Sequence, residues 1–187
     1  MKNIAVLASG TGSNAAAIMD RFIGYEDIFV SLVASNNPEA GVLEKAAERG
    51  VPTSTFTKSQ LNDEEFMTEL LRGIDVVVLA GFLLKIPAFL VREFEGRMIN
   101  IHPALLPKYG GKGMYGEHVH KAVIENEDKE TGITIHYVSE NYDEGDIILS
   151  ETVSLSQRDT PKTAALKVQK LEHKHLPEVV KKLARSL

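Results

Sequence analysis

The sequence contains no cysteine, and this absence excludes a disulfide bond, a zinc–thiolate site and a thiol nucleophile. It also favours a reducing compartment. Long apolar runs are absent as well. Residues 76–84 form an apolar run that is far too short to span a membrane, and residues 4–9 are too few for a signal peptide. We therefore expect a cytoplasmic protein that has no membrane partner.

Positive charge is scarcer than negative charge. The 187 residues include 21 Lys and Arg against 26 Asp and Glu, a formal charge of −5. This balance argues against nucleic-acid binding, although a local basic pocket could still hold a small anion. Apolar residues make up 43% and charged residues 25%, as in ordinary globular proteins. No repeat or linker divides the chain, so we expect one domain over residues 1–187.

Short apolar runs alternate with helical patterns in the first half of the chain. We expect strands at 4–8, 28–34, 52–56 and 75–80, and helices from 15, over 38–49 and over 62–72. Gly50 is a helix stop signal, and Asn62 followed by Glu65 resembles a helix start. The run 75–80 is nearly all Val, Leu and Ala, which is typical of a parallel strand buried on both faces. The pattern predicts an α/β fold with a doubly wound, mostly parallel, Rossmann-like sheet.

The second half of the chain has a different pattern. Two longer strands are expected at 132–138 and 147–155, and the short segment between them makes an antiparallel pair plausible. A last helix should begin at Thr160 and Pro161, since Thr is a good N-cap and Pro favours the first helical position. Pro177 should kink or interrupt that helix.

A glycine-rich segment, Gly10 to Asn14, lies between the first expected strand and the first expected helix. Free amides in the first turn of a helix attract phosphate, and ligands of open α/β sheets bind at the carboxyl ends of strands. Ala15 stands where a dinucleotide loop has its third glycine, so a monophosphate is favoured. A tight turn with Ser13 or Asn14 as the helix cap explains the segment equally well.

The segment Arg97 to Pro103 predicts a strand that ends at a proline. Residues two apart on a strand share a face, so Asn100 and His102 should project together. An amide can stabilise an oxyanion, and an imidazole can carry a proton near neutral pH. A buried polar pair that satisfies backbone groups is the competing interpretation, and the residues alone slightly favour it.

The run Ile99 to Pro107, Ile-Asn-Ile-His-Pro-Ala-Leu-Leu-Pro, closely resembles the signature of the folate-dependent formyltransferases. Matching motifs follow the same order along nearly the whole chain: 8–14, 77–82, 136–138 with 143–145, and Gln169 with Glu172 and His173. The loop at 8–14 and the short length resemble the branch that acts on phosphoribosylglycinamide (GAR). The resemblance implies a formyltransferase fold and transfer of the formyl group of 10-formyltetrahydrofolate to the GAR amine in purine (IMP) biosynthesis, without a metal.

The resemblance also implies residue roles. Asn100 would bind the oxyanion and His102 would donate a proton. Asp143 would pair with His102 and favour imidazolium, with Asp146 as the second choice; an ordinary turn acid is the plainer interpretation of Asp143. GAR would contact Gly12, Ser13, Asn14 and Glu172, although Glu172 alone would suggest an exposed helix acid. The folate would contact Leu83, Leu84, Lys85, Ile86, Asn100, Ser139, Glu140, Asn141 and Tyr142.

The remaining histidines carry weaker signals. His118 and His120 form a His-x-His pair, but they point apart on a helix and no carboxylate completes a metal site. One of them is expected to line the amine-substrate pocket. His136 is most simply a hydrogen-bonded structural residue.

Two departures from the family pattern bear on the substrates. The loop at 108–117 is longer than usual, which makes the amine acceptor less secure than the reaction. Glu64 stands near a position where the family often has an arginine for the folate tail, with Lys58 and Lys85 as candidate substitutes.

The competing functions are a formyltetrahydrofolate hydrolase, a methionyl-tRNA formyltransferase and a non-catalytic phosphometabolite-binding module. The first usually carries an extra N-terminal domain. The second needs a C-terminal domain and a basic surface. Small-molecule substrates and a monomer or homodimer are expected.

Overall fold

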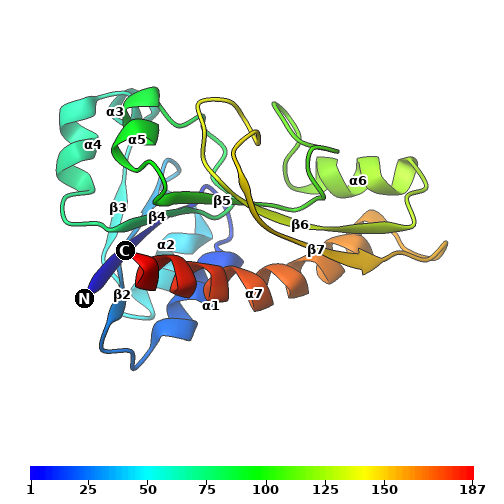
Figure 1. The fold of residues 1–187 in the computed structure, drawn as a ribbon, viewed down its shortest axis with the longest axis horizontal. Coiled ribbons are helices and arrows are strands. Elements are labelled where there is room, and N and C mark those ends of the chain that lie inside the picture. The colour runs from blue at the N-terminus through cyan, green and yellow to red at the C-terminus, as the bar shows by residue number, and fades with distance from the viewer.

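The computed structural model describes residues 1–187, and strands alternate with helices along most of the chain (Figure 1). The strands are β1 Lys2–Leu7, β2 Ile28–Ser35, β3 Thr53–Thr55, β4 Val76–Leu79, β5 Met98–His102, β6 Glu130–Tyr137 and β7 Ile147–Ser154. The helices are α1 Ser13–Phe22, α2 Gly41–Ala47, α3 Lys58–Leu61, α4 Glu64–Leu70, α5 Ala88–Glu93, α6 Glu117–Glu125 and α7 Pro161–Ser186.

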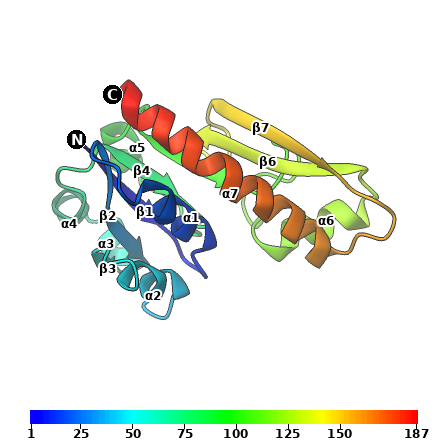
Figure 2. The same ribbon diagram turned by 90° about the horizontal axis from the view of Figure 1, so that it is seen from below.

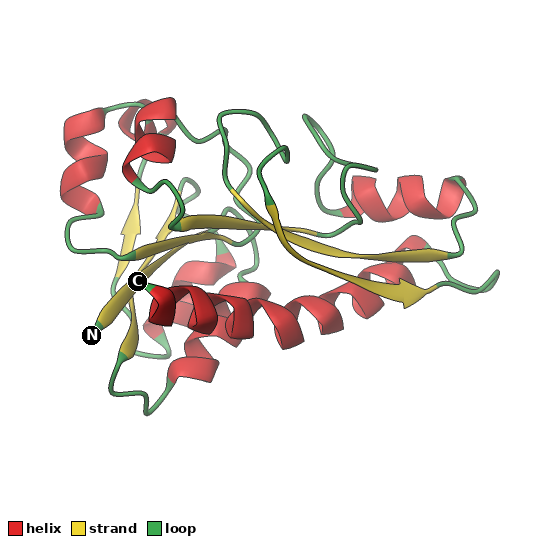
Figure 3. Ribbon diagram, viewed as in Figure 1, coloured by secondary structure: helices red, strands yellow, loops and turns green.

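All seven strands form one sheet in the order β3-β2-β1-β4-β5-β6-β7. The strands β1 to β5 are parallel, whereas β6 pairs antiparallel with both β5 and β7. Figure 3 shows β6 and β7 extending beyond the parallel half as a long twisted pair. The predicted α/β fold with a mostly parallel sheet and antiparallel strands in its second half is confirmed.

Helices cover both faces of the parallel half, and each face has its own apolar core. Along β1, Ile4 and Val6 pack toward α1, α2 and α7, whereas Ala5 and Leu7 pack toward α3, α4 and α5. The same alternation holds along β4, where all four residues are buried. Strands that bury both faces need apolar side chains at every position, which explains the continuous Val and Leu run.

The strand order reverses between β1 and β4, because β2 and β3 lie on one side of β1 while β4 and β5 lie on the other. Open α/β sheets bind ligands outside the carboxyl ends of the strands at such a switch point. Two sequence segments predicted to be functional follow here: Gly10 to Asn14 after β1, and the end of β5 at His102.

The last helix, α7, crosses the sheet from α6 to the chain termini, which lie close together (Figures 1 and 2). It begins as predicted: Thr160 is the N-cap and Pro161 the first residue. The expected interruption at Pro177 is wrong, because α7 continues to Ser186. A proline inside a helix costs about 3 kcal/mol, because it lacks an N–H and its ring clashes with the preceding turn. Buried residues on both sides of it, including Leu176 and Val180, offset that cost.

Two other helix starts differ from expectation. The expected helix over 62–72 is divided into α3 and α4, and Asp63 rather than Asn62 caps α4 by accepting a hydrogen bond from the Phe66 N–H at 3.1 Å. The Asn62 side chain instead donates to the Lys58 carbonyl at the end of α3. Helix α1 has no side-chain cap, because its N-cap is Gly12 with φ 75°.

Candidate functional site

A cavity of about 630 Å³ opens at the carboxyl ends of β1, β4 and β5. The sequence segments predicted to bind phosphate and to carry the chemistry therefore share one cavity. Its walls are Gly10, Thr11, Gly12, Ser13, Asn14, Ala80, Gly81, Phe82, Leu83, Asn100, Ile101, His102, Pro103, Gly111, Lys112, Gly113, Met114, Tyr115, Gly116, His120, Tyr142, Asp143 and Glu172.

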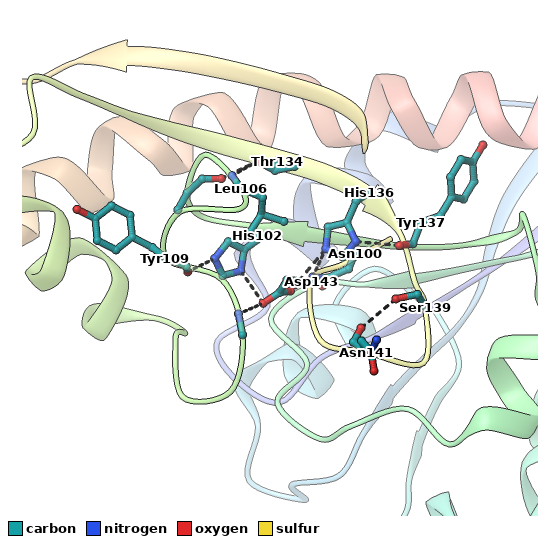
Figure 4. A network of polar contacts seen from close by, with 12 residues as sticks. Asn100, His102, Leu106, Tyr109, Thr134, His136, Tyr137, Ser139, Asn141 and Asp143 are labelled. Atoms are coloured by element: carbon teal, nitrogen blue, oxygen red, sulfur yellow. Dashed lines mark hydrogen bonds and ion pairs between the residues drawn. The ribbon is translucent and has the colours of Figure 1, made fainter. Parts of the chain in front are cut away.

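His102 has a polar neighbour beside each of its ring nitrogens (Figure 4). Its Nε2 lies 2.7 Å from the Tyr109 carbonyl oxygen, which can only accept, so Nε2 carries a proton. Its Nδ1 lies 3.7 Å from Asp143 Oδ2. Asp143 is thus the partner of His102, and the second choice, Asp146, is exposed on the surface. The ring is fixed with Nδ1 directed toward the carboxylate.

Asp143 also contacts Asn100 and His136. Its Oδ1 accepts from Asn100 Nδ2 at 3.4 Å and lies 3.6 Å from His136 Nε2. Its Oδ2 accepts from the Gly111 N–H at 2.8 Å. The carboxylate therefore links β5, β6 and the loop before α6, as Figure 4 shows.

The local backbone explains how Asp143 reaches this position. It has φ 56°, a left-handed conformation that Asp tolerates better than most residues. In the same loop, a Cβ on Gly145 would collide with the Tyr137 carbonyl oxygen. The loop between β6 and β7 is therefore tightly constrained, and it turns Asp143 back over β5.

Burial and neighbouring charges act on both groups of the pair. Burial lowers the pKa of His102, and the raising effects of Asp143 and the Tyr109 carbonyl do not overcome it. Asp143 acts in the expected direction, toward imidazolium, but desolvation outweighs it and the net shift of the His102 pKa is downward. Burial opposes ionisation of Asp143, but the adjacent His136 ring, the hydrogen bond from the Gly111 N–H and the charge of His102 lower its pKa.

The glycine-rich loop makes a close contact that requires glycine. A Cβ on Gly12 would lie 2.5 Å from Val42 Cβ, and the positive φ disfavours other residues as well. Lys45 Nζ donates to the Thr11 carbonyl at 2.8 Å, and Gln169 Nε2 donates to Ser13 Oγ at 3.2 Å. The first turn of α1 is thus presented to the cavity by a fixed loop.

Glu172 is not an exposed helix acid. It lines the cavity from α7, and burial raises its pKa although a hydrogen bond with the Asn14 side chain lowers it. The Asn14 Oδ1 atom is buried without a partner. His120, also in the cavity wall, is 7% exposed and its Nδ1 has no partner. Of the His-x-His pair, the one facing the cavity is His120.

The expected folate wall is only partly at the cavity. Leu83 and Tyr142 line it, with exposed fractions of 48% and 39%. Ile86 instead packs into the core shared with α5. The side chains of Leu84, Lys85, Ser139, Glu140 and Asn141 are not part of the cavity wall. Glu64 lies exposed in the first turn of α4, also outside the wall.

The sequence analysis assigned no role in the site to three residues that contribute to it. His136 lies opposite Asn100 in the β5–β6 pairing, and their side-chain nitrogens are 3.1 Å apart. Tyr109 contributes its backbone carbonyl to His102. Ser9 Oγ accepts from the Leu83 N–H at 3.0 Å and joins the ends of β1 and β4. The pairing of β5 with β6 could have predicted that His136 lies beside Asn100. No sequence pattern predicts a contact made by a backbone carbonyl, such as that of Tyr109.

No group of three or more His, Asp or Glu side chains is arranged to hold a metal ion. No helix has the length and apolarity that crossing a membrane requires.

Comparison with known sequences gives a consistent result. Residues 2–180 match the formyl transferase family. The chain is 42% identical over 190 residues to the chloroplastic phosphoribosylglycinamide formyltransferase of Arabidopsis thaliana, and it covers 64% of that protein. It is 37% identical to the phosphoribosylglycinamide formyltransferase of Bacillus subtilis, with 98% of this chain and 95% of that protein covered. The chain thus spans less than two thirds of the plant relative and nearly all of the bacterial one.

Solved structures agree with the sequences. Phosphoribosylglycinamide formyltransferase from Anaplasma phagocytophilum superposes with a TM-score of 0.90 at 33% identity, over 98% of this chain and 87% of that chain. The enzyme of that name from Streptococcus pneumoniae gives a TM-score of 0.86 at 34% identity, with coverages of 98% and 99%.

Proposed function

This chain belongs to the formyl transferase family, and we propose that it transfers the formyl group of 10-formyltetrahydrofolate to the amine of 5'-phosphoribosylglycinamide, a step of purine biosynthesis. The observation that carries the proposal is that one cavity contains both functional segments. It joins the amides of Gly12 to Asn14 to the cluster of Asn100, His102 and Asp143. A phosphorylated amine anchored at the first segment can present its nitrogen at the second.

The cavity also fits the folate co-substrate. Leu83, Tyr115 and Tyr142 are exposed apolar or aromatic side chains, and all three line it. Planar heteroaromatic ligands bind well in pockets of this kind, where a few polar groups set their orientation. We assign the pterin to the side of Leu83 and Tyr142, with the backbone of residues 84–86 and 139–141 as further contacts.

Asn100 stabilises the oxygen that gains charge during transfer. When the amine nitrogen attacks the formyl carbon, the carbonyl π electrons move to the formyl oxygen. The Asn100 amide is shared between His136 and the longer, 3.4 Å contact with Asp143. The longer hydrogen bond is the weaker one, and its N–H can turn to the oxyanion.

His102 moves the proton. Since burial lowers its pKa, the ring is neutral at pH 7, with Nε2–H held by Tyr109 and the Nδ1 lone pair available. Nδ1 takes the proton that the attacking amine loses. The resulting imidazolium, stabilised by Asp143, donates that proton to the folate nitrogen as its bond to the formyl carbon breaks. His102 Nδ1 thus gains one proton and loses one proton in each turnover.

Glu172 and Asn14 complete the amine-substrate side. Their side chains face the cavity beside the phosphate loop, where hydroxyl groups of a ribose can contact them. We further propose that the reaction takes place in the cytoplasm, on small-molecule substrates, and without a metal. The expected assembly is a monomer or a homodimer.

The test is an amine-dependence assay. Purified protein with 10-formyltetrahydrofolate should release tetrahydrofolate only when GAR is present, and formyl-GAR should appear in equal amount. Other phosphorylated amines should react more slowly. Equal release without any amine would identify a hydrolase, and binding without release would identify a non-catalytic module.

A further inference from the structure

A cluster of polar contacts holds the start of the loop that precedes α6. Lys108 Nζ donates to both carboxylate oxygens of Asp128 at 2.7 Å. Tyr109 Oη also donates to Asp128, at 2.7 Å, and accepts from Asn126 Nδ2 at 2.8 Å. Asp128 lies in the segment between α6 and β6, so this cluster fastens the start of the loop to that segment.

The fastened residue has an unusual backbone. Tyr109 has φ 60°, a left-handed conformation that is rare for an aromatic residue and is held only where surrounding contacts impose it. Its side chain is held by Asp128 and lies under Lys108, whose Nζ is 5.0 Å from the ring centroid. This backbone conformation directs the Tyr109 carbonyl at His102 Nε2.

We propose that Asp128 is a positioning residue for His102. By holding Lys108 and Tyr109, it keeps the Tyr109 carbonyl on Nε2, so that the His102 ring has Nε2 protonated and Nδ1 facing Asp143 and the reacting atoms. The inference rests on the proposed function for its kinetic part only, because the state of the His102 ring can be observed without turnover.

Charged and titratable groups surround both His102 and Asp128. His102 is surrounded by Asp143, His136 and His120. Asp128 faces Lys108 and Tyr109, with Lys129 and Glu130 in the same neighbourhood. Lys108 lowers the pKa of Asp128, so the carboxylate stays ionised throughout the neutral range.

Asp128→Asn tests the proposal directly. Loss of the carboxylate frees Tyr109, and the carbonyl that supports the imidazolium is lost from Nε2. The pKa of His102 should then fall. The kcat of the enzyme rises with pH as His102 loses its proton, and in the variant this rise should occur at lower pH. The maximal kcat, reached above that pH, should fall about tenfold. KM for the folate should change little.

Two further variants separate positioning from stability. Tyr109→Phe removes only the hydroxyl, keeps the carbonyl, and should move the rise in kcat in the same direction; combined with Asp128→Asn it should add little. Asp159→Asn is the matched control. Asp159 also accepts hydrogen bonds from a lysine, Lys167, at 2.7 Å and from a hydroxyl, that of Thr163, but it lies outside the cavity that contains His102. It should leave the pH profile unchanged.

Nitrogen-15 NMR of the histidine rings gives the second readout. Wild-type His102 should show the Nε2-protonated form at neutral pH, and Asp128→Asn should show a mixture of the two neutral forms. An unchanged ring state and pH profile in Asp128→Asn would overturn the inference. If wild-type protein shows the fixed ring but forms no formyl-GAR, the proposed function fails while the positioning role stands.

Discussion

Asn100 Nδ2 lies 3.1 Å from His136 Nε2, because the two residues are directly opposed on the antiparallel strands β5 and β6. His136 Nδ1 donates to the Tyr137 carbonyl at 2.8 Å, which leaves Nε2 as an acceptor. The amide nitrogen of Asn100 must therefore face this histidine and Asp143. The orientation of the group proposed to bind the oxyanion is fixed by the neighbouring strand.

His136→Phe should lower kcat about tenfold, because the Asn100 amide loses the acceptor that orients it. The substrates should bind almost as tightly as before. Steady-state kinetics with both substrates saturating is the measurement. A rise in KM with kcat unchanged would mean that His136 serves binding and does not orient Asn100.

His102→Ala should reduce kcat by at least about a hundredfold, the scale of acid–base catalysis. The phosphate and folate contacts remain, so isothermal titration should show GAR binding within about twofold of wild type. Turnover near the wild-type rate would remove His102 from the mechanism.

Ser13→Asp should weaken GAR and spare the folate. A carboxylate in the first turn of α1 repels a phosphate bound to the same amides, and KM for GAR should rise about tenfold or more. Ser13→Asn is the control of similar shape without charge. If the aspartate variant weakens both substrates equally, the phosphate does not lie at this loop.

Glu172→Gln should stabilise the fold while harming GAR binding. Burial raises the pKa of Glu172, so its folded-state contribution is lost as pH rises through that pKa. Above that pKa the neutral amide of the glutamine avoids the desolvated charge. A gain of about 1 kcal/mol corresponds to a rise of about 2–4 °C in Tm.

Glu178→Gln is the matched control for that experiment. Glu178 lies on the same helix, is largely exposed, and pairs with Arg21 at 2.7 Å. Its substitution should not raise Tm. A Glu172→Gln protein with unchanged Tm and unchanged KM for GAR would contradict both parts of the prediction.

Stability should fall on mild acidification because of buried histidines. Burial lowers the pKa of His120 and of His102 below that of the unfolded chain. Their contribution to stability is full above about pH 6.5 and is lost as pH falls below it, since the unfolded chain then binds more protons. His120→Leu should reduce the difference in unfolding free energy between pH 7.5 and pH 5.5, measured in urea.

His118→Leu serves as the control for acidification. His118 is exposed on the same helix, where its ring makes an edge-to-face contact with Tyr115 at 5.6 Å between ring centroids. An equal reduction in both variants would show that burial is not the cause.

The sequence by itself determined the parallel half of the fold. The Val and Leu run of β4 must be buried on both faces, and alternating helices supply the cover. It also placed Asn100 and His102 on one face of β5, because a strand repeats every two residues. These are local patterns, and local patterns can be read along the chain.

The tertiary structure alone decided which distant groups meet. Register between β5 and β6 brought His136 to Asn100, and the constrained loop after β6 brought Asp143, the first choice from the resemblance, to His102. Burial outweighed the expected effect of Asp143 on the His102 pKa, and helix α7 continues through Pro177, where core residues pack on both sides. Desolvation, register and backbone contacts depend on everything that surrounds a residue, and no sequence period encodes them.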